Sequence, residues 1–200
     1  KEDIEDFDSR VKKFIKAETG TDEIPLYTVE LKIDGLKVVL EYEKGLLIRA
    51  STRGDGEVGE DVTHNVRTIE SIPLRLKRDV DVIVEGEIWM GEKHLKVLNK
   101  EREKRGEAPF ANPRNVAAGS IRQLDPKISA SRKLDNFVYD LGRTSERVPD
   151  SQEEELLYLK DLGFKVNKNW MICESVDEII EFWKKWQKKS KSEDYWIDGV

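Results

Sequence analysis

Glu30-Leu31-Lys32-Ile33-Asp34-Gly35 is the most informative segment of this 200-residue chain. Successive side chains of a β-strand point to opposite faces of the sheet. We therefore expect Glu30, Lys32 and Asp34 to share one face, while the leucine and isoleucine between them enter a core. Gly35 then permits a turn, or a close approach of the backbone to a ligand, because it carries no Cβ. The segment predicts a half-buried strand that displays a lysine between two carboxylates.

The lysine of this segment has two interpretations. The pattern alone favours a solvated strand face on which opposite charges pair. The alternative is a lysine nucleophile, which must be uncharged to react, although neighbouring carboxylates favour the charged form of an ammonium group. A nucleophilic Lys32 would therefore need positive charge to offset Asp34 and Glu30. Arg53 is one candidate, and Mg²⁺, a natural partner of carboxylates and nucleotide phosphates, is another.

The segments around this strand predict a mixed α+β domain preceded by one helix. Hydrophobic patterns indicate strands over residues 26–36, 37–42, 46–52, 80–90 and 134–141, with short strands at 164–166, 170–173 and 196–200. Helices are expected over residues 3–16, 60–69, 92–105 and 113–124. Two pairs with capping-box spacing predict two further helix starts, Ser151 with Glu154 and Ser175 with Glu178.

Composition indicates a heavily charged surface, with 38% hydrophobic and 38% charged residues. No stretch reaches the ~18 apolar residues of a membrane span, and the first residues lack the apolar region of a signal peptide. A single cysteine, Cys173, excludes an internal disulfide and a cysteine-rich zinc site and indicates a reducing, cytoplasmic setting. The net charge of −6, taken alone, argues against nucleic-acid binding, since phosphate contacts usually leave a basic signature.

A glycine-rich segment, Gly54-x-Gly56-x-x-Gly59, fits the dinucleotide-binding fingerprint between a strand and a helix. Its acidic residues would set negative charge where a pyrophosphate should lie. The strands before it also predict an antiparallel hairpin, not the start of a parallel βαβ unit. We therefore reject a Rossmann fold. His64 and His94 have no acidic or cysteine partners at ligand spacing, so no metal site is assigned to the protein itself.

Six further motifs accompany the lysine segment, namely residues 52–63, 65–69, 85–87, 110–115, 117–125 and 197–200. With that order and spacing, the chain from Leu26 onward resembles the adenylation domain of bacterial NAD-dependent DNA ligases. The resemblance implies an ATP-grasp-like nucleotidyltransferase core, α+β, with antiparallel sheets flanking a nucleotide-binding cleft and helices outside. It also implies a helical lead-in over residues 1–24 and an adenylation domain over residues 25–200 that is truncated at its C-terminal end.

The resemblance assigns roles to individual residues. Lys32 would attack the adenylate phosphorus of NAD and release nicotinamide mononucleotide, and Asp34 would tune Lys32. The expected adenosine contacts are Glu30 at the adenine edge, Tyr139 stacked on the adenine ring, and Arg53 and Glu87 at the ribose. Arg114 and Arg122, about two turns apart on one predicted helix, would approach nicked double-stranded DNA.

Each of these roles has a simpler structural alternative. Tyr139 lies in an apolar strand and fits an ordinary core position. Glu87 alternates with Glu85 along a strand and fits a solvated face, and the two arginines fit a polar helix face. Because the local patterns favour these alternatives, the assigned roles depend on the resemblance.

The function that the resemblance implies is sealing of DNA nicks in replication and repair, with NAD and Mg²⁺ as cofactors. The family pattern continues to lysines beyond Val200, so we expect the fragment alone to be weak or inactive. The sequence does not define the oligomeric state, and a monomer is the default expectation. Two alternatives remain open. An ATP-dependent ligase or capping-type nucleotidyltransferase is disfavoured by the motifs at 53–63 and 117–125, and a non-catalytic nucleotide-binding or DNA-clamp module by the intact Lys32.

Overall fold

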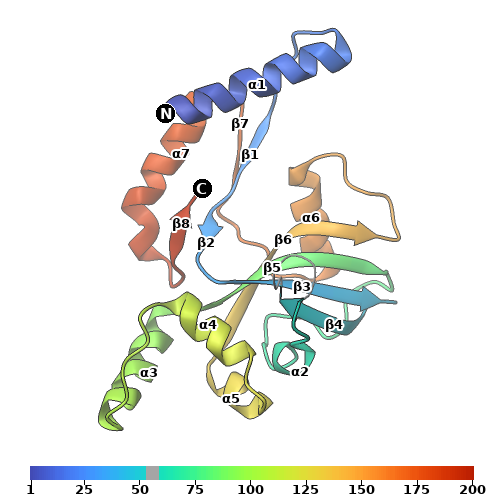
Figure 1. Cartoon of the computed structure of the whole chain (residues 1–200). Helices are drawn as coiled ribbons and strands as arrows, with labels where there is room; N and C mark the ends of the chain where they lie inside the picture. The colour runs from blue at the N-terminus through green and yellow to red at the C-terminus, as the bar shows by residue number, and fades with distance from the viewer. Residues whose placement is uncertain (53–58) are drawn as a thin grey trace.

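The computed structural model describes residues 1–52 and 59–200. Within these residues the protein has seven α-helices and three antiparallel sheets (Figure 1). This confirms the α+β class and the antiparallel pairing expected from the sequence. Arg53, the candidate ribose contact, lies outside the described residues, as does most of the glycine-rich segment.

A four-stranded sheet in the order β4-β3-β5-β6 forms the centre of the molecule. Its strands span Leu36–Glu43 (β3), Leu46–Thr52 (β4), Val82–Met90 (β5) and Leu134–Thr144 (β6). The turn between β3 and β4 has positive φ at Lys44 (46°) and Gly45 (73°), the conformation that matches the twist of a two-residue hairpin. A Cβ at Gly45 would lie 2.4 Å from the carbonyl oxygen of Arg78, so this position requires glycine.

The strand predicted over residues 26–36 is divided in the structure. Tyr27–Val29 (β1) pairs with Met171–Cys173 (β7), whereas Lys32–Ile33 (β2) pairs with Ile197–Gly199 (β8). The division follows from the different partners of the two halves. At Gly35 the chain passes against β5, where a Cβ would lie 2.4 Å from the carbonyl oxygen of Ile88. The close approach expected at Gly35 is therefore to the sheet backbone.

The helices are Glu2–Thr19 (α1), Thr63–Val66 (α2), Glu92–Lys104 (α3), Pro113–Ile121 (α4), Pro126–Ser131 (α5), Gln152–Leu162 (α6) and Val176–Lys189 (α7), with a 3-10 turn at Ser190–Ser192 (η1). The helix predicted from residue 60 begins only at Thr63, so the prediction was wrong for its first turn. Residues 60–62 lie beside β4 instead. There the N–H of Thr52 donates to the carbonyl of Glu60, and the N–H of Val62 donates to the carbonyl of Ala50. Residues 164–166, predicted as a strand, do not form one. Their backbone hydrogen bond to β6 runs from the N–H of Val138 to the carbonyl of Lys165.

Helix ends follow the capping signals of the sequence. Asn112 accepts the N–H of Asn115 at 2.8 Å, and Ser151 and Ser175 accept N–H groups at the starts of α6 and α7. α4 ends before residue 124, because the Asn65 amide donates to the carbonyls of Ile121 and Gln123 at 2.7 and 2.8 Å. The unpredicted α5 begins with the same kind of signal, a capping aspartate followed by proline at positions 125 and 126.

The chain buries two clusters of hydrophobic side chains. The larger lies around the central sheet and includes Val38, Leu40, Val84 and Ile121, none of which is exposed. The smaller lies beneath the two short sheets and α7, and its members are Val29, Leu31, Trp89, Phe137, Cys173, Phe182, Trp186 and Tyr195. The predicted division into two faces is confirmed for Leu31, which belongs to this smaller cluster, and for Lys32, which is exposed, whereas Glu30, Ile33 and Asp34 are all partly buried.

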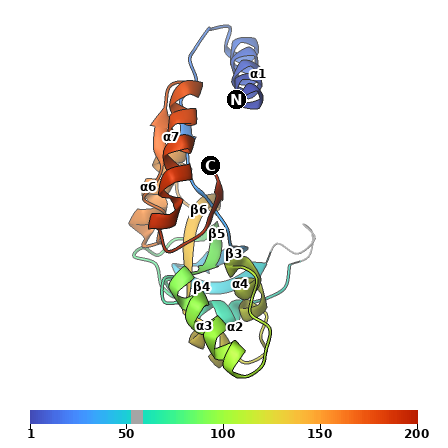
Figure 2. The ribbon, with the colours of Figure 1, turned by 90° about the vertical axis from the view of Figure 1, so that its left-hand side faces the viewer.

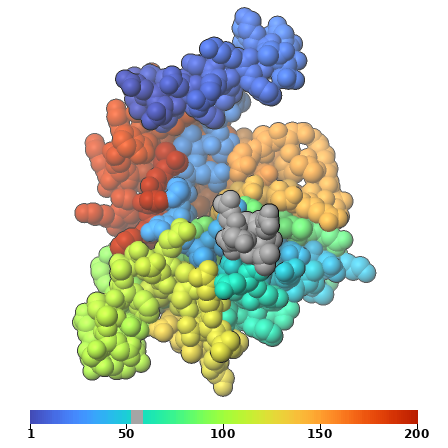
Figure 3. All heavy atoms as spheres, in the orientation of Figure 1, coloured from blue at the N-terminus to red at the C-terminus, as the bar shows by residue number. Residues whose placement is uncertain are grey.

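α1 lies at the edge of the molecule, next to α7 and away from the central sheet (Figures 1 and 2). None of its residues is buried. It is held by a hydrogen bond of 2.8 Å from the Tyr27 hydroxyl to Asp8 and by contact between the rings of Phe7 and Tyr27. Figure 3 shows α1 in dark blue across one end of the molecule. Among the described helices, none is both long and apolar enough to cross a membrane.

Candidate functional site

A pocket of ≈ 470 Å³ lies between the β1–β2 segment and the central sheet. Its walls come from distant parts of the chain and consist of Glu30, Leu31, Lys32, Ile33, Lys37, Glu87, Arg114, Phe137, Tyr139, Asn167 and Val200. The structure therefore brings together five residues that the sequence analysis selected, namely Glu30, Lys32, Glu87, Arg114 and Tyr139. Asp34 is not part of the pocket wall but contacts a residue that is, since its Oδ1 lies 4.0 Å from Nη1 of Arg114.

Lys32 is 60% exposed in its side chain and forms an ion pair with Asp198. The pairing of β2 with β8 produces this contact, since Lys32 lies opposite Gly199 in the register. The hydrogen bond from Lys32 lowers the pKa of Asp198. Sequence reasoning expected Glu30 and Asp34 to flank the lysine and gave Asp198 no role. The signal that could have identified Asp198 was its motif at residues 197–200.

Glu87, on β5, lines the pocket. Burial raises the pKa of Glu87 to about 7, against the opposing charges of Arg114 and Lys32. The negative charge of Asp34 acts in the same direction as burial. Near neutral pH the Glu87 carboxyl is therefore divided between its protonated and ionised forms.

Glu30 lies between β1 and β2 and is partly buried. Its Oε1 accepts a hydrogen bond of 3.0 Å from Nε2 of Gln152. Burial raises the pKa of Glu30, the Gln152 hydrogen bond opposes this shift, and the negative charges of Glu155 and Asp140 add to it. Tyr139, on β6, is also half-buried at the pocket wall.

Arg122 lies outside the pocket, although the sequence placed it with Arg114 on one helix. It follows the last residue of α4, is 48% exposed in its side chain, and pairs with Glu60 through Nε at 2.5 Å. Arg114, in the first turn of α4, lines the pocket and is also exposed. The two arginines therefore occupy different surroundings.

Three residues of the pocket wall were missed in the sequence. Lys37, on β3, adds a cation and forms an ion pair with Glu85. Phe137 adds an aromatic ring that stacks on Trp89 with centroids 5.3 Å apart. The buried Nδ2 of Asn167 has no hydrogen-bond partner among the described residues. No local pattern marks Asn167, because it lies in an irregular segment that only the tertiary fold brings to the pocket.

The pocket combines groups suited to a nucleotide. Glu30 and Glu87 can accept hydrogen bonds from amino or hydroxyl groups, and Tyr139 offers a ring for stacking. Lys32 and Arg114 supply positive charge for phosphate. In the described part of the chain, no three His, Cys, Asp or Glu side chains lie together in a way that could hold a metal ion.

The α+β framework and a pocket of this volume, lined by apolar and aromatic side chains with a few charged groups, have the form of a small-molecule-binding domain. A family model described as "NAD-dependent DNA ligase adenylation domain" matches residues 1–200. The DNA ligase of Bacillus cytotoxicus is 50% identical over 199 residues, which cover 99% of this chain and 29% of that protein. The DNA ligase of Thermotoga petrophila is 48% identical over 200 residues, which cover 100% of this chain and 28% of that protein.

The chain therefore belongs to the NAD-dependent DNA ligase adenylation domain family. It spans less than a third of the length of these two curated relatives. The resemblance inferred from the sequence motifs is confirmed at the level of the family.

Proposed function

We propose that this chain carries the lysine that is adenylated by NAD in a DNA ligase, and that the whole protein seals nicks in double-stranded DNA. The observation that carries the proposal is the position of Lys32 in one pocket with Glu30, Glu87, Arg114 and Tyr139. Membership of the adenylation domain family supports the same activity. The division into a lead-in over residues 1–24 and an adenylation domain over residues 25–200 belongs to this proposal.

The pocket is proposed as the nucleotide cleft. Tyr139 would stack on the adenine ring and Glu30 would accept a hydrogen bond from its edge. Glu87 would accept hydrogen bonds from the ribose hydroxyls, together with Arg53 as a donor to the same sugar. In this assignment the adenine amino group and the ribose hydroxyls, which can donate, face the carboxylates of Glu30 and Glu87, which can accept.

The chemical step that these residues support is attack of the Lys32 amine on the adenylate phosphorus. The N–P bond forms as the P–O bond to nicotinamide mononucleotide breaks, and the amine gives up a proton. Because a nucleophilic amine must be neutral, the Lys32 ammonium has to give a proton to Asp198 or to water before attack, which ends the ion pair. Arg114, on the same pocket, would stabilise the charge that spreads over the phosphate oxygens.

Mg²⁺ is the proposed metal. It is commonly held by one or two carboxylates together with substrate phosphates, and it keeps several of its waters. Asp34 lies beside the pocket, next to Arg114, so a carboxylate is available for an ion that would bind with the nucleotide. Such an ion would add positive charge to that of Arg114 at the phosphate.

The test uses the intact protein, incubated with NAD and Mg²⁺ and analysed by mass spectrometry. We expect wild type to gain the mass of one AMP and Lys32→Ala to gain none. Lys37→Ala is the matched control, because Lys37 lines the same pocket, and it should keep the adduct. An adduct that persists in Lys32→Ala, or that is lost only in Lys37→Ala, contradicts the assignment. Replacing NAD by ATP distinguishes an ATP-dependent relative, and no adduct from either donor indicates a non-catalytic module.

A further inference from the structure

Gln152 is the first residue of α6, and its side-chain amide makes two hydrogen bonds. Nε2 donates to Oε1 of Glu30 and to the backbone carbonyl of Tyr139, each at 3.0 Å. A carboxylate and a carbonyl are both acceptors, so only the NH₂ end of the amide satisfies them. The amide has two N–H groups, and each is directed to one of these acceptors.

The two acceptors belong to the residues proposed to bind adenine. Glu30 and Tyr139 both line the pocket, whereas Gln152 is absent from its walls and is half-buried behind them. Gln152 therefore joins the β1–β2 segment to β6 from outside the pocket. A ligand would contact Glu30 and Tyr139 without contacting the residue that aligns them.

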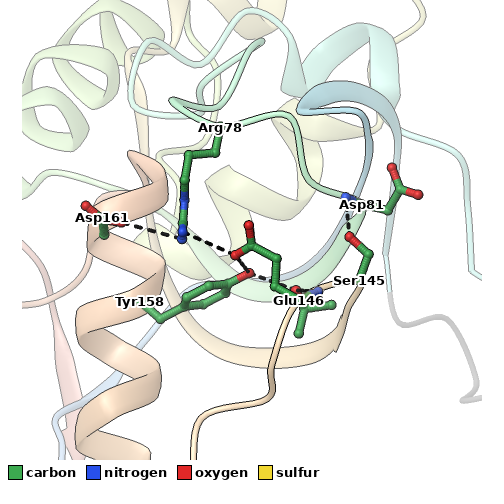
Figure 4. Close-up of polar contacts among 7 residues, drawn as sticks. Arg78, Asp81, Ser145, Glu146, Tyr158 and Asp161 are labelled. Carbon is green, nitrogen blue, oxygen red and sulfur yellow. Dashed lines mark hydrogen bonds and ion pairs between the residues drawn. The ribbon is translucent and has the colours of Figure 1, made fainter.

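α6 is held against β6 and the loop that follows it by contacts along its length, and these contacts fix the backbone from which the Gln152 side chain projects. Near its start, the N–H of Leu141 donates to Glu155 at 2.7 Å. One turn further, the Tyr158 hydroxyl lies 2.7 Å from the Thr144 hydroxyl and donates to Glu146 at 3.1 Å (Figure 4). Preorganisation of this kind allows a supporting residue to hold a binding group in one geometry.

A third anchor of α6 is Arg78, in the loop before β5. Its guanidinium bridges Glu146 at 3.3 Å and Asp161 of α6 at 3.4 Å, and it lies over the Tyr158 ring (Figure 4). These contacts are at the end of α6 remote from Gln152. They offer a way to disturb the helix without altering the contact with Glu30.

The charges around Glu30 determine what it can recognise. Oε1 is engaged by Gln152, which leaves Oε2 available to a ligand. Burial is the main influence that favours protonation of Glu30, and the negative charges of Glu155 and Asp140 add to it. The cations on the same pocket wall are Lys32, Lys37 and Arg114, of which Lys32 is paired with Asp198 and Lys37 with Glu85. The Gln152 N–H favours the ionised, acceptor form of Glu30 against these influences.

We propose that Gln152 is a positioning residue that keeps Glu30 as a hydrogen-bond acceptor and so sets the preference of the pocket for a 6-aminopurine over a 6-oxopurine. The proposal rests on the adenine role of Glu30 in the proposed function. Adenine presents an amino donor at position 6, whereas guanine and hypoxanthine present an oxygen acceptor there. An ionised carboxylate pairs with the first and repels the second, but a protonated carboxyl can donate to the second.

The test compares the binding of AMP and IMP to the intact protein by calorimetry. Wild type should prefer AMP by about ten-fold or more, the value of one hydrogen bond to a charged group. Gln152→Met keeps the length of the side chain but removes both donors. This variant should bind AMP roughly ten-fold more weakly and IMP with nearly unchanged affinity, so that the preference for AMP is lost. A purely structural role would weaken both nucleotides equally.

In the variant Gln152→Glu, we expect the affinity for AMP to depend on pH. The introduced carboxyl faces Glu30, and two neighbouring carboxyl groups raise the pH at which the pair takes up one proton. With that proton the introduced group can donate to Glu30 as the amide did, and without it the two repel. AMP affinity of this variant should therefore rise as pH falls, and the ratio of its affinity to that of wild type should rise with it. A ratio that is constant with pH contradicts the proposal.

Tyr158→Phe is the control for a general loosening of α6, because it removes the hydroxyl contacts and leaves Gln152 in place. It should retain the wild-type ratio of AMP to IMP affinity. If wild type binds neither AMP nor NAD, the proposed function itself is wrong. If wild type prefers AMP and Gln152→Met keeps that preference, the function stands and the role of Gln152 is overturned.

Discussion

Glu87 is a carboxyl on which burial and charge act in opposite directions. Burial raises its pKa to about 7, and Asp34 adds to this effect, while Arg114 and Lys32 oppose it. Because the pKa of an unfolded glutamate is near 4.5, the folded protein binds an extra proton between these two values. Stability should then fall as pH rises through that interval, and the loss should be complete above the folded pKa.

The variant Glu87→Gln should flatten this part of the pH profile. We expect it to raise the free energy of unfolding at pH 8 by about 1–2 kcal/mol relative to wild type, after discounting for partial exposure of the group, and to change it little at pH 4.5. Denaturant unfolding at several pH values provides the measurement. The same slope in wild type and variant between pH 4.5 and 7 would show that another group is responsible.

At the scale of the strand and helix, the passage from β2 to β3 depends on Gly35. Its Cα faces the β5 backbone so closely that a Cβ would lie 2.4 Å from the Ile88 carbonyl oxygen and 2.8 Å from Cγ of Glu87. Real Cβ atoms do not approach a backbone oxygen so closely, and β5 is a central strand that cannot withdraw without disturbing its neighbours. The position connects the lysine segment to the sheet, so strain there would reach the pocket.

Gly35→Ala should therefore lower the free energy of unfolding by about 2 kcal/mol or more, as overpacking in a tight site does. Gly119→Ala is the matched control. Gly119 lies in α4 with no atom within 4 Å of an added Cβ, and alanine there should stabilise the helix by about 0.5–1 kcal/mol. Thermal unfolding of both variants measures the difference. Equal effects of the two substitutions would contradict the account of Gly35.

The sequence was informative where the signal is local. Strand β4 and the starts of α4, α6 and α7 follow from alternation and from capping residues such as Asn112, Ser151 and Ser175. The division of residues 26–36 was not predictable, because it is decided by pairing with β7 and β8, far along the chain. Asn65 likewise ended α4 early through hydrogen bonds across the fold.

The same distinction applies to the site. Five candidates meet at one pocket, but the motifs that selected them carry no information about which side chain contacts which. Glu30 and Asp34 flank Lys32 in the sequence, yet its ion pair is with Asp198. The two bonds of Gln152 are invisible to any local pattern, since α6 must first dock on the sheet. The roles of all these residues stay predictions.

For the whole molecule, the net charge of −6 has to be reconciled with a proposed DNA partner. Phosphate binding depends on the local surface more than on total charge, since screening restricts interactions to about 10 Å at moderate salt. Arg114 and Arg122 are both exposed, but their surroundings differ. Arg122 is outside the pocket and has Glu60 as its partner, whereas Arg114 lines the pocket. The two arginines should therefore differ in which step of the reaction they serve.

Arg122→Ala should weaken binding of the intact protein to a nicked duplex and leave adenylation by NAD unchanged. Loss of one phosphate contact reduces the slope of log affinity against log salt by about one, so the deficit should be largest at low salt. Arg114→Ala should impair both steps, because Arg114 is also part of the nucleotide pocket.

Arg75→Ala serves as the control, since Arg75 is exposed and pairs with Asp79 of its own segment. Fluorescence anisotropy over a salt series measures the slopes, and the mass gain with NAD measures adenylation. If Arg122→Ala lost adenylation, or if its salt slope equalled that of Arg75→Ala, the separation of roles between the two arginines would be wrong.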